Sequence, residues 1–112
     1  MLESEIEKKF RDEIKKLGGK AYKFVSPGNA GVPDRLVILP GNKIGFAELK
    51  RPGEKPRPLQ KAQIKKIQSL GAFVMVVDSE EKIKEFIKEL NKWNLMHMNI
   101  KSTVFQKWLG HQ

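Results

Sequence analysis

Two acidic residues and one lysine stand where a β-hairpin would bring them together. Asp34 begins one apolar stretch, and Glu48 and Lys50 close the next, separated by one residue. Side chains alternate across a strand, so Glu48 and Lys50 project from the same face. A tight turn between the two stretches would place Asp34 opposite or diagonal to Glu48. Two carboxylates are therefore predicted to converge beside one lysine.

Such a group suits metal-dependent hydrolysis of a phosphodiester bond. The two carboxylates, the main-chain carbonyl of Leu49 and water are the hard oxygen ligands that Mg²⁺ prefers. Lys50 would orient the nucleophile or stabilise developing negative charge. Glu-x-Lys alone is a weak signal, because Glu48 can merely pair with Lys50 or Arg35 on a surface. The glycine-rich approach to the first strand and the placement of Asp34 at its start favour the catalytic interpretation.

The periodicity of apolar residues predicts an α/β domain that would position this group. Its order is helix, three strands, helix, strand, helix, and Pro40-Gly41-Asn42 is typical of a hairpin connection. The last strand is a continuous apolar run, as expected of a strand buried on both faces. The helices are expected to end near residues 17, 70 and 91, and the strands to cover residues 21–25, 35–39, 43–49 and 72–77.

Length and composition restrict the class of protein. The 112 residues suit one domain, and no stretch approaches the roughly 20 apolar residues that span a bilayer. The acidic N-terminus lacks the basic start of a secretory signal, so we expect a cytoplasmic protein with no membrane partner. The absence of cysteine excludes disulfides, thiolate zinc sites and cysteine nucleophiles, and agrees with a reducing compartment.

The net charge of +9 favours a polyanionic partner. Basic residues cluster beside the candidate group, where Glu54 is the only acid between residues 50 and 66. A basic surface alone can serve solubility, but clustering next to a candidate site favours phosphate binding. Four of the cluster are expected to contact the DNA backbone without sequence preference, so that binding falls steeply with salt. These four are Lys55, Arg57, Lys61 and Lys65.

Two segments carry a family resemblance. Gly31-Val32-Pro33-Asp34-Arg35, followed by Phe46-Ala47-Glu48-Leu49-Lys50, resembles the signature of the PD-(D/E)XK nuclease superfamily, specifically its virus-type replication-repair nuclease (VRR-NUC) branch. Ser26-Pro27-Gly28 and Leu59-Gln60 also resemble that branch. The resemblance covers about residues 1–90.

The resemblance implies a restriction-endonuclease-like α/β fold with an αβββαβ core. Its mixed central sheet would be flanked by helices, here followed by a C-terminal helix and a tail. We expect the nuclease core with its final helix to cover residues 1–91. The apolar-rich tail, residues 92–112, is expected to pack on the domain or to contact a second copy.

The same resemblance implies an activity. Members cleave DNA with Mg²⁺ or Mn²⁺ and leave a 5′-phosphate and a 3′-hydroxyl, which would make Asp34 and Glu48 metal ligands and place Lys50 at the attacking water. It also implies a homodimer acting on branched DNA, including four-way (Holliday) junctions, in a bacterial or phage-infected cell. Ser26 and Arg35 join the expected DNA contacts.

The family often adds a glutamate from the first helix, and Glu3, Glu5 and Glu7 are available. Glu3 shares the inward face with Ile6 and Phe10, so it is the preferred catalytic residue and metal ligand, with Glu7 second. In the alternative interpretation, all three acids simply favour the helix N-terminus through its dipole.

Gln60 is a further candidate catalytic residue. It lies four before Ile64 and seven before Ile67, which places its amide on the apolar side of the second helix. There it would hold Lys50, a water or a phosphate; the alternative is a helix-start hydrogen bond at the solvent edge.

Other readings remain open. The same residues would serve a flap or nicking nuclease, and a non-catalytic basic DNA-binding module would need no metal. Tyr22, Trp93 and Trp108 could stack on bases, although aromatic side chains are more often core residues. His97 and His111 show no ligand spacing and are given no role.

Overall fold

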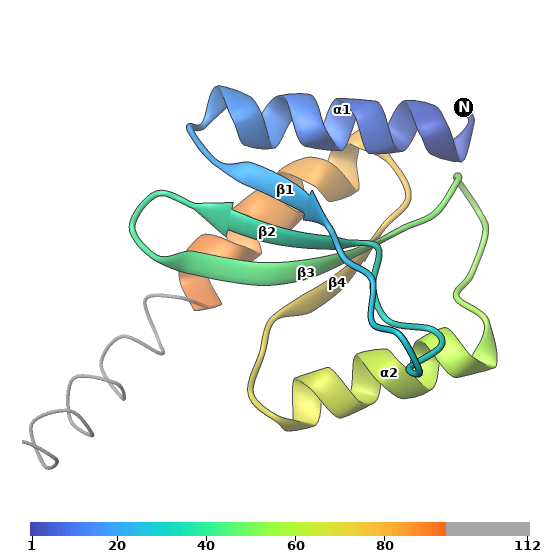
Figure 1. Ribbon diagram of the computed structural model, residues 1–112. Helices are drawn as coiled ribbons and strands as arrows, with labels where there is room; N and C mark the ends of the chain where they lie inside the picture. Colours follow the sequence, from blue (N-terminus) through green and yellow to red (C-terminus); the bar gives the residue numbers. More distant parts are fainter. Residues whose placement is uncertain (94–112) are drawn as a thin grey trace, which may run out of the picture.

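A four-stranded sheet lies between helices in the computed structural model, which describes residues 1–93 (Figure 1). The observed order of elements is the predicted one, and a further helix covers residues 80–93. The labelled elements are α1 (Glu3–Lys16), β1 (Lys20–Lys23), β2 (Arg35–Leu39), β3 (Lys43–Leu49), α2 (Pro58–Ser69) and β4 (Val74–Val77).

The sheet is mixed, as predicted. Its strands lie in the order β1-β2-β3-β4, with the first three antiparallel and β4 parallel to β3. Three residues connect β2 to β3, and Gly41 and Asn42 both have positive φ, 85° and 66°. Glycine and asparagine tolerate that conformation better than other residues, which explains why this sequence turns here. The turn sets the β2–β3 register on which the candidate group depends.

The core lies on one face of the sheet. Ile6, Phe10 and Ile14 of α1 are all completely buried, in agreement with the predicted amphipathic pattern. Phe10 packs edge-on against Phe86 of the helix of residues 80–93, with ring centroids 5.1 Å apart. In Figure 1, α1 lies above the sheet and α2 below it, so the two labelled helices cover opposite faces.

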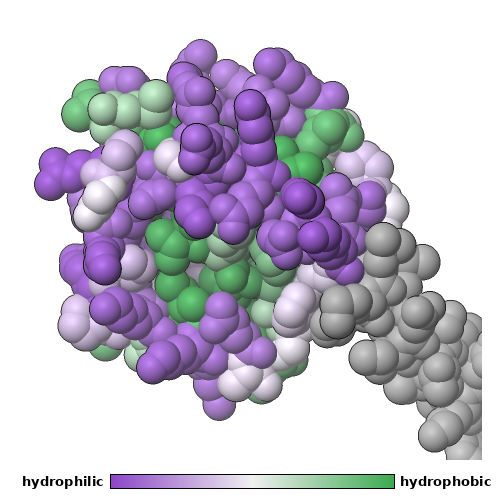
Figure 2. Space-filling view, turned by 180° about the vertical axis from the view of Figure 1, so that it is seen from behind, coloured by the Kyte–Doolittle hydropathy of each residue, from purple (hydrophilic) through white to green (hydrophobic). Residues whose placement is uncertain are grey.

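The last strand differs from its prediction. It starts at Val74 rather than near residue 72, and only Val74 and Val77 are buried, whereas Met75 and Val76 are half-buried. β4 is an edge strand of the sheet, and Gln60 is the only buried residue of α2. Neighbouring elements therefore cover β4 less completely than they would cover a central strand. Figure 2, seen from behind, shows an apolar patch surrounded by hydrophilic residues.

The first strand is also shifted, to Lys20–Lys23, although the main-chain N–H of Phe24 still donates to the Asp34 carbonyl at 2.8 Å. Trp93 packs against the core, with its ring centroid 6.0 Å from that of Phe73. Neither helix α1, helix α2 nor residues 80–93 combine the length and apolar content of a membrane crossing. The predictions for the tail, Trp108, His97 and His111 concern residues outside the described part.

Candidate active site

Asp34 and Glu48 meet at the open end of the β2–β3 hairpin. Arg35 pairs with Ala47, so one further step along both strands sets Asp34 opposite Glu48, as the hairpin argument predicted. The Asp34 side chain is held in place by the backbone, because its Oδ2 accepts a hydrogen bond from the Leu49 N–H at 2.9 Å. One carboxylate oxygen of Asp34 is thereby bound to the strand that carries Glu48.

Glu48 is the most unusual side chain of the described structure. It is 0% exposed, and neither of its carboxylate oxygens has a hydrogen-bond partner among residues 1–93. Burial raises the pKa of Glu48 to about 8, and the neighbouring Asp34 carboxyl group contributes further to the rise. The positive charge of Lys50 opposes it, with Nζ 4.0 Å from Oε1. A carboxylate in this position favours a cation beside it.

Lys50 follows β3 directly and is 5% exposed. Its N–H donates to the Val77 carbonyl at 3.0 Å, which anchors the backbone against β4. Its Nζ lies between two acids, 4.0 Å from Glu48 and 3.7 Å from Glu54. Glu54 also lies 2.8 Å from Nε of Arg51. Glu54 is not among the predicted site residues, since a four-residue spacing within a proline-rich loop predicts no contact.

A small pocket of about 170 Å³ lies at Asp34 and distinguishes the candidate acids of α1. Glu3 and Glu7 line it together with Asp34 and Leu49. Glu7 forms an ion pair with Arg35, whereas Glu3 pairs with no cation of residues 1–93. The charge of Glu3 also contributes to the raised pKa of Glu48. Of the two, Glu3 is the acid that remains available to the pocket.

The donor set suits a divalent cation only in part. Two adjacent carboxylates, one of them buried without a partner, match the hard-oxygen preference of Mg²⁺ and Mn²⁺. Within residues 1–93, however, no three acidic or histidine side chains lie close enough together to hold a metal. The structure therefore does not bring Glu3 into one ligand cluster with Asp34 and Glu48. Water and main-chain carbonyls would complete the coordination.

Gln60 is 7% exposed, so its predicted place on the inner side of the helix is observed. Its Oε1 accepts a hydrogen bond from the Arg57 N–H at 2.8 Å, which is the helix-start role of the alternative interpretation. The loop before Asp34 lies against this helix start: a Cβ on Gly31 would stand 2.7 Å from the Leu59 carbonyl. Gly31 therefore permits close packing between the two segments.

The expected DNA contacts differ in availability. Four are exposed and pair with no acid of the described residues: Lys55, Arg57, Lys61 and Lys65. Ser26 is half-buried, and its Oγ accepts a hydrogen bond from the Asn29 amide at 2.9 Å. The Arg35 side chain is only 12% exposed and is bound by Glu7 and by the Ala21 carbonyl, 3.3 Å away. Arg35 is turned inward, because it ties α1 to the sheet.

Among the known proteins that are similar to this chain, two are informative. One is "Putative nuclease p44" from Acyrthosiphon pisum secondary endosymbiont phage 1, which is 54% identical over 79 residues, or 70% of this chain and 85% of that protein. The other is a solved structure described as a VRR_NUC domain, with a TM-score of 0.72 and 34% identity over 77% of this chain and 94% of that one. No family model matches the sequence.

Proposed function

The chain belongs to the VRR-NUC family of nucleases, and on that premise we propose that it is a DNA endonuclease that requires Mg²⁺ or Mn²⁺. The observation that carries the proposal is the Glu48 carboxylate, which is buried beside Asp34 and lacks a hydrogen-bond partner among the described residues. Burying such a group is costly unless a cation neutralises it. Catalysis gives a reason to retain it.

Asp34, Glu48 and the main-chain carbonyl of Leu49 would hold the cation. Asp34 is oriented by the Leu49 N–H, which leaves its second oxygen for the metal. A divalent cation supplies Lewis acidity there, since it lowers the pKa of water and withdraws charge from the scissile phosphate. Glu3 lines the same pocket and adds negative charge that favours a cation.

Lys50 would act on the reacting groups directly. Its ammonium group lies on the face of β3 that carries Glu48, where it can orient the attacking water or stabilise the charge that develops on the phosphate. Gln60 would assist from α2. Because its Oε1 is used at the helix start, its amide NH₂ is the group left to donate to a phosphate oxygen.

A purely DNA-binding role explains the site less well. Two adjacent carboxylates repel each other and repel phosphates, and burial raises the pKa of Glu48 to about 8. A binding module would gain nothing from that arrangement. The exposed cations Lys55, Arg57, Lys61 and Lys65 serve either role, since they supply sequence-independent contacts to the backbone.

We propose branched DNA, including four-way junctions, as the substrate, in line with the family resemblance; a flap or nicking preference would use the same residues. A homodimer fits this substrate, because a junction offers equivalent strands to two sites. Exposed apolar residues such as Ile38 and Ile44, 38% and 46% exposed, and the apolar patch of Figure 2 support a protein interface. The match to a phage protein supports a bacterial or phage-infected cell as the setting.

The test is a substrate panel. Purified protein is incubated with four-way, flap, nicked, linear duplex and single-stranded DNA, each with Mg²⁺, Mn²⁺ or a chelator, and its mass is measured by light scattering. We expect metal-dependent cutting that is fastest on the junction, by a dimer. Cutting in chelator would refute the metal requirement, and intact substrates in both metals would refute the nuclease proposal.

A further inference from the structure

A second basic surface lies apart from the exposed cations of residues 55–65. It is a groove of about 600 Å³ between α1 and the edge strand β1. Its lining includes five cationic side chains and one carboxylate, that of Asp12. The cations are Arg11, Lys15, Lys20, Lys23 and Arg35. None of them belongs to the basic cluster of residues 50–66.

Most of this charge is not neutralised within the described protein. Arg35 is paired with Glu7, but the other four cations form no ion pair with any residue between 1 and 93. The one carboxylate, that of Asp12, forms an ion pair with Lys8, whose Nζ lies 3.5 Å from Oδ2. Lys20 lies over the ring of Tyr22, with Nζ 5.6 Å from the centroid. The groove therefore presents unpaired positive charge.

The groove is continuous with the candidate active site. Lys23 and Arg35 line both the groove and the pocket that contains Glu3 and Asp34. A polyanion bound at the pocket can thus extend past Lys23 and Arg35 into the groove, where Asp12 is the one acid of the lining. The lining includes none of the exposed cations Lys55, Arg57, Lys61 and Lys65, so the groove would contact a different part of the same ligand.

We infer that this groove, termed the α1–β1 groove, binds the phosphate backbone of the nucleic acid on one side of the cleavage point. The inference rests on the proposed nuclease function and adds a second contact surface to it. A second copy of the chain is the alternative occupant, since an unpaired strand edge can receive another strand. The cationic lining opposes that occupant, because each copy carries a net charge of +9. A polyphosphate backbone is the complementary partner.

The test compares two double variants of the same helix. Arg11→Gln/Lys15→Gln removes two cations from the groove, and Lys9→Gln/Lys16→Gln removes two from the other side of α1, where they pair with Glu80 and Glu13. Binding of a fluorescein-labelled four-way junction and a linear duplex is measured by anisotropy in chelator over a salt series. Thermal unfolding of each variant checks that it folds, and cleavage in Mg²⁺ is measured in parallel.

The groove variant should bind about tenfold more weakly and lower the slope of log affinity against log salt by about 2, whereas the control variant should stay near the wild type. Equal losses in both variants, or no loss in either, would overturn the inference. A change of oligomeric state in the groove variant alone would instead identify a protein interface and also overturn it. If the wild type cuts DNA while the groove variant binds normally, only this inference fails; if the wild type neither binds nor cuts, the proposed function fails.

Discussion

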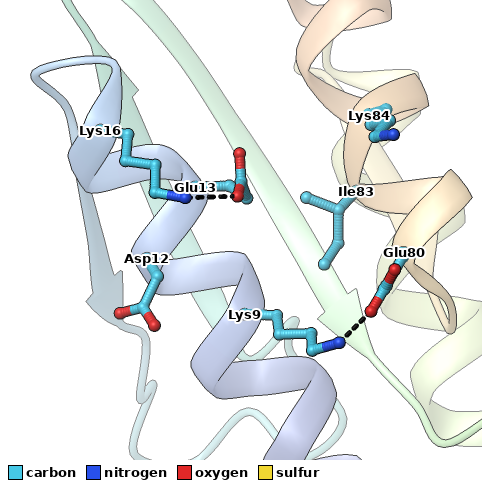
Figure 3. Close-up of a pocket in the computed structure, with 7 residues that line it drawn as sticks. All are labelled: Lys9, Asp12, Glu13, Lys16, Glu80, Ile83 and Lys84. Carbon is cyan, nitrogen blue, oxygen red and sulfur yellow. Dashed lines mark hydrogen bonds and ion pairs between the residues drawn. The ribbon is translucent and has the colours of Figure 1, made fainter.

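Two pockets on α1 differ in how the charged side chains in or next to them are paired. The larger, about 330 Å³, lies between α1 and the helix of residues 80–93, and four of its charged residues form ion pairs: Lys9 with Glu80, and Lys16 with Glu13 (Figure 3). The smaller, about 170 Å³, is lined by Asp34 and Leu49, and the adjacent Glu48, which lies outside that lining, has no hydrogen-bond partner for its oxygens in the described structure.

The pKa values follow the same contrast. The Lys9 ammonium group holds the pKa of Glu80 below its ordinary value, whereas burial raises the pKa of Glu48 to about 8. Exposed, paired charges of the first kind contribute little to anything but solubility and local order. A buried carboxyl group without a hydrogen-bond partner lowers stability and needs a function to explain it. Pocket size is thus a poorer guide to the site than a buried carboxyl group without a hydrogen-bond partner.

The largest contrast should appear in cleavage. Asp34→Asn, Glu48→Gln and Lys50→Ala are each expected to reduce the cleavage rate by a factor on the order of a thousand or more, because each removes a charge that acts on the reacting groups. Single-turnover cleavage of the preferred substrate in Mg²⁺ measures this. The matched control is Glu80→Gln in the other pocket, which should cut at the wild-type rate. Normal cleavage by any of the three variants would remove that residue from the mechanism.

The next largest effect should appear in the pH dependence of the free energy of unfolding. In chelator, the unfolded chain ionises Glu48 near pH 4.5 while the folded protein keeps it protonated to about pH 8. Raising the pH between these values therefore favours unfolding, and the folded protein loses stability until ionisation is complete in both states. Glu48→Gln should remove that loss and be more stable at pH 8 by about 1–3 kcal/mol.

Urea unfolding in chelator at a series of pH values measures this difference. Adding Mg²⁺ should restore stability to the wild type at pH 8 but not to Glu48→Gln, since the cation favours the ionised carboxylate. Parallel pH profiles for the two proteins would show that Glu48 is not the buried acid responsible.

A smaller effect is expected at Glu54, the second acid beside Lys50. Glu54→Gln removes a charge 3.7 Å from the ammonium group but leaves Lys50 its contact with Glu48. Cleavage should fall by less than about tenfold, since only the positioning of Lys50 is weakened. Arg51→Gln is the control, because it removes the other partner of Glu54 without touching Lys50. A greater loss in the control would assign the effect to the loop rather than to the lysine.

The smallest effect is expected in the paired pocket. Lys9→Gln breaks the ion pair with Glu80, yet both side chains are about half exposed, 47% and 56%. Pairs of this kind often contribute nothing measurable, so the melting temperature and the cleavage rate should both stay close to those of the wild type. A clear drop in melting temperature would show that this pair holds α1 to the helix of residues 80–93.

Local patterns predicted most of the fold and the centre of the site. The hairpin register that sets Asp34 opposite Glu48 needed only a short turn and strand alternation, and β2 and β3 have the predicted bounds. Errors lie at the sheet edges: β1 and β4 differ from their predicted bounds. Edge strands depend on what covers them, which is a property of distant segments.

The sequence by itself determined which residues meet along neighbouring strands, because the contacts within a hairpin follow from a two-residue period and a short loop. Only the tertiary structure decided which of the two α1 acids in the pocket is paired, since Arg35 binds Glu7 and not Glu3. It also decided that Gln60 accepts a hydrogen bond at the start of α2 and that a basic groove runs along β1. These outcomes depend on how each helix is rotated against the sheet, and that angle is set by packing of the whole core rather than by any local pattern.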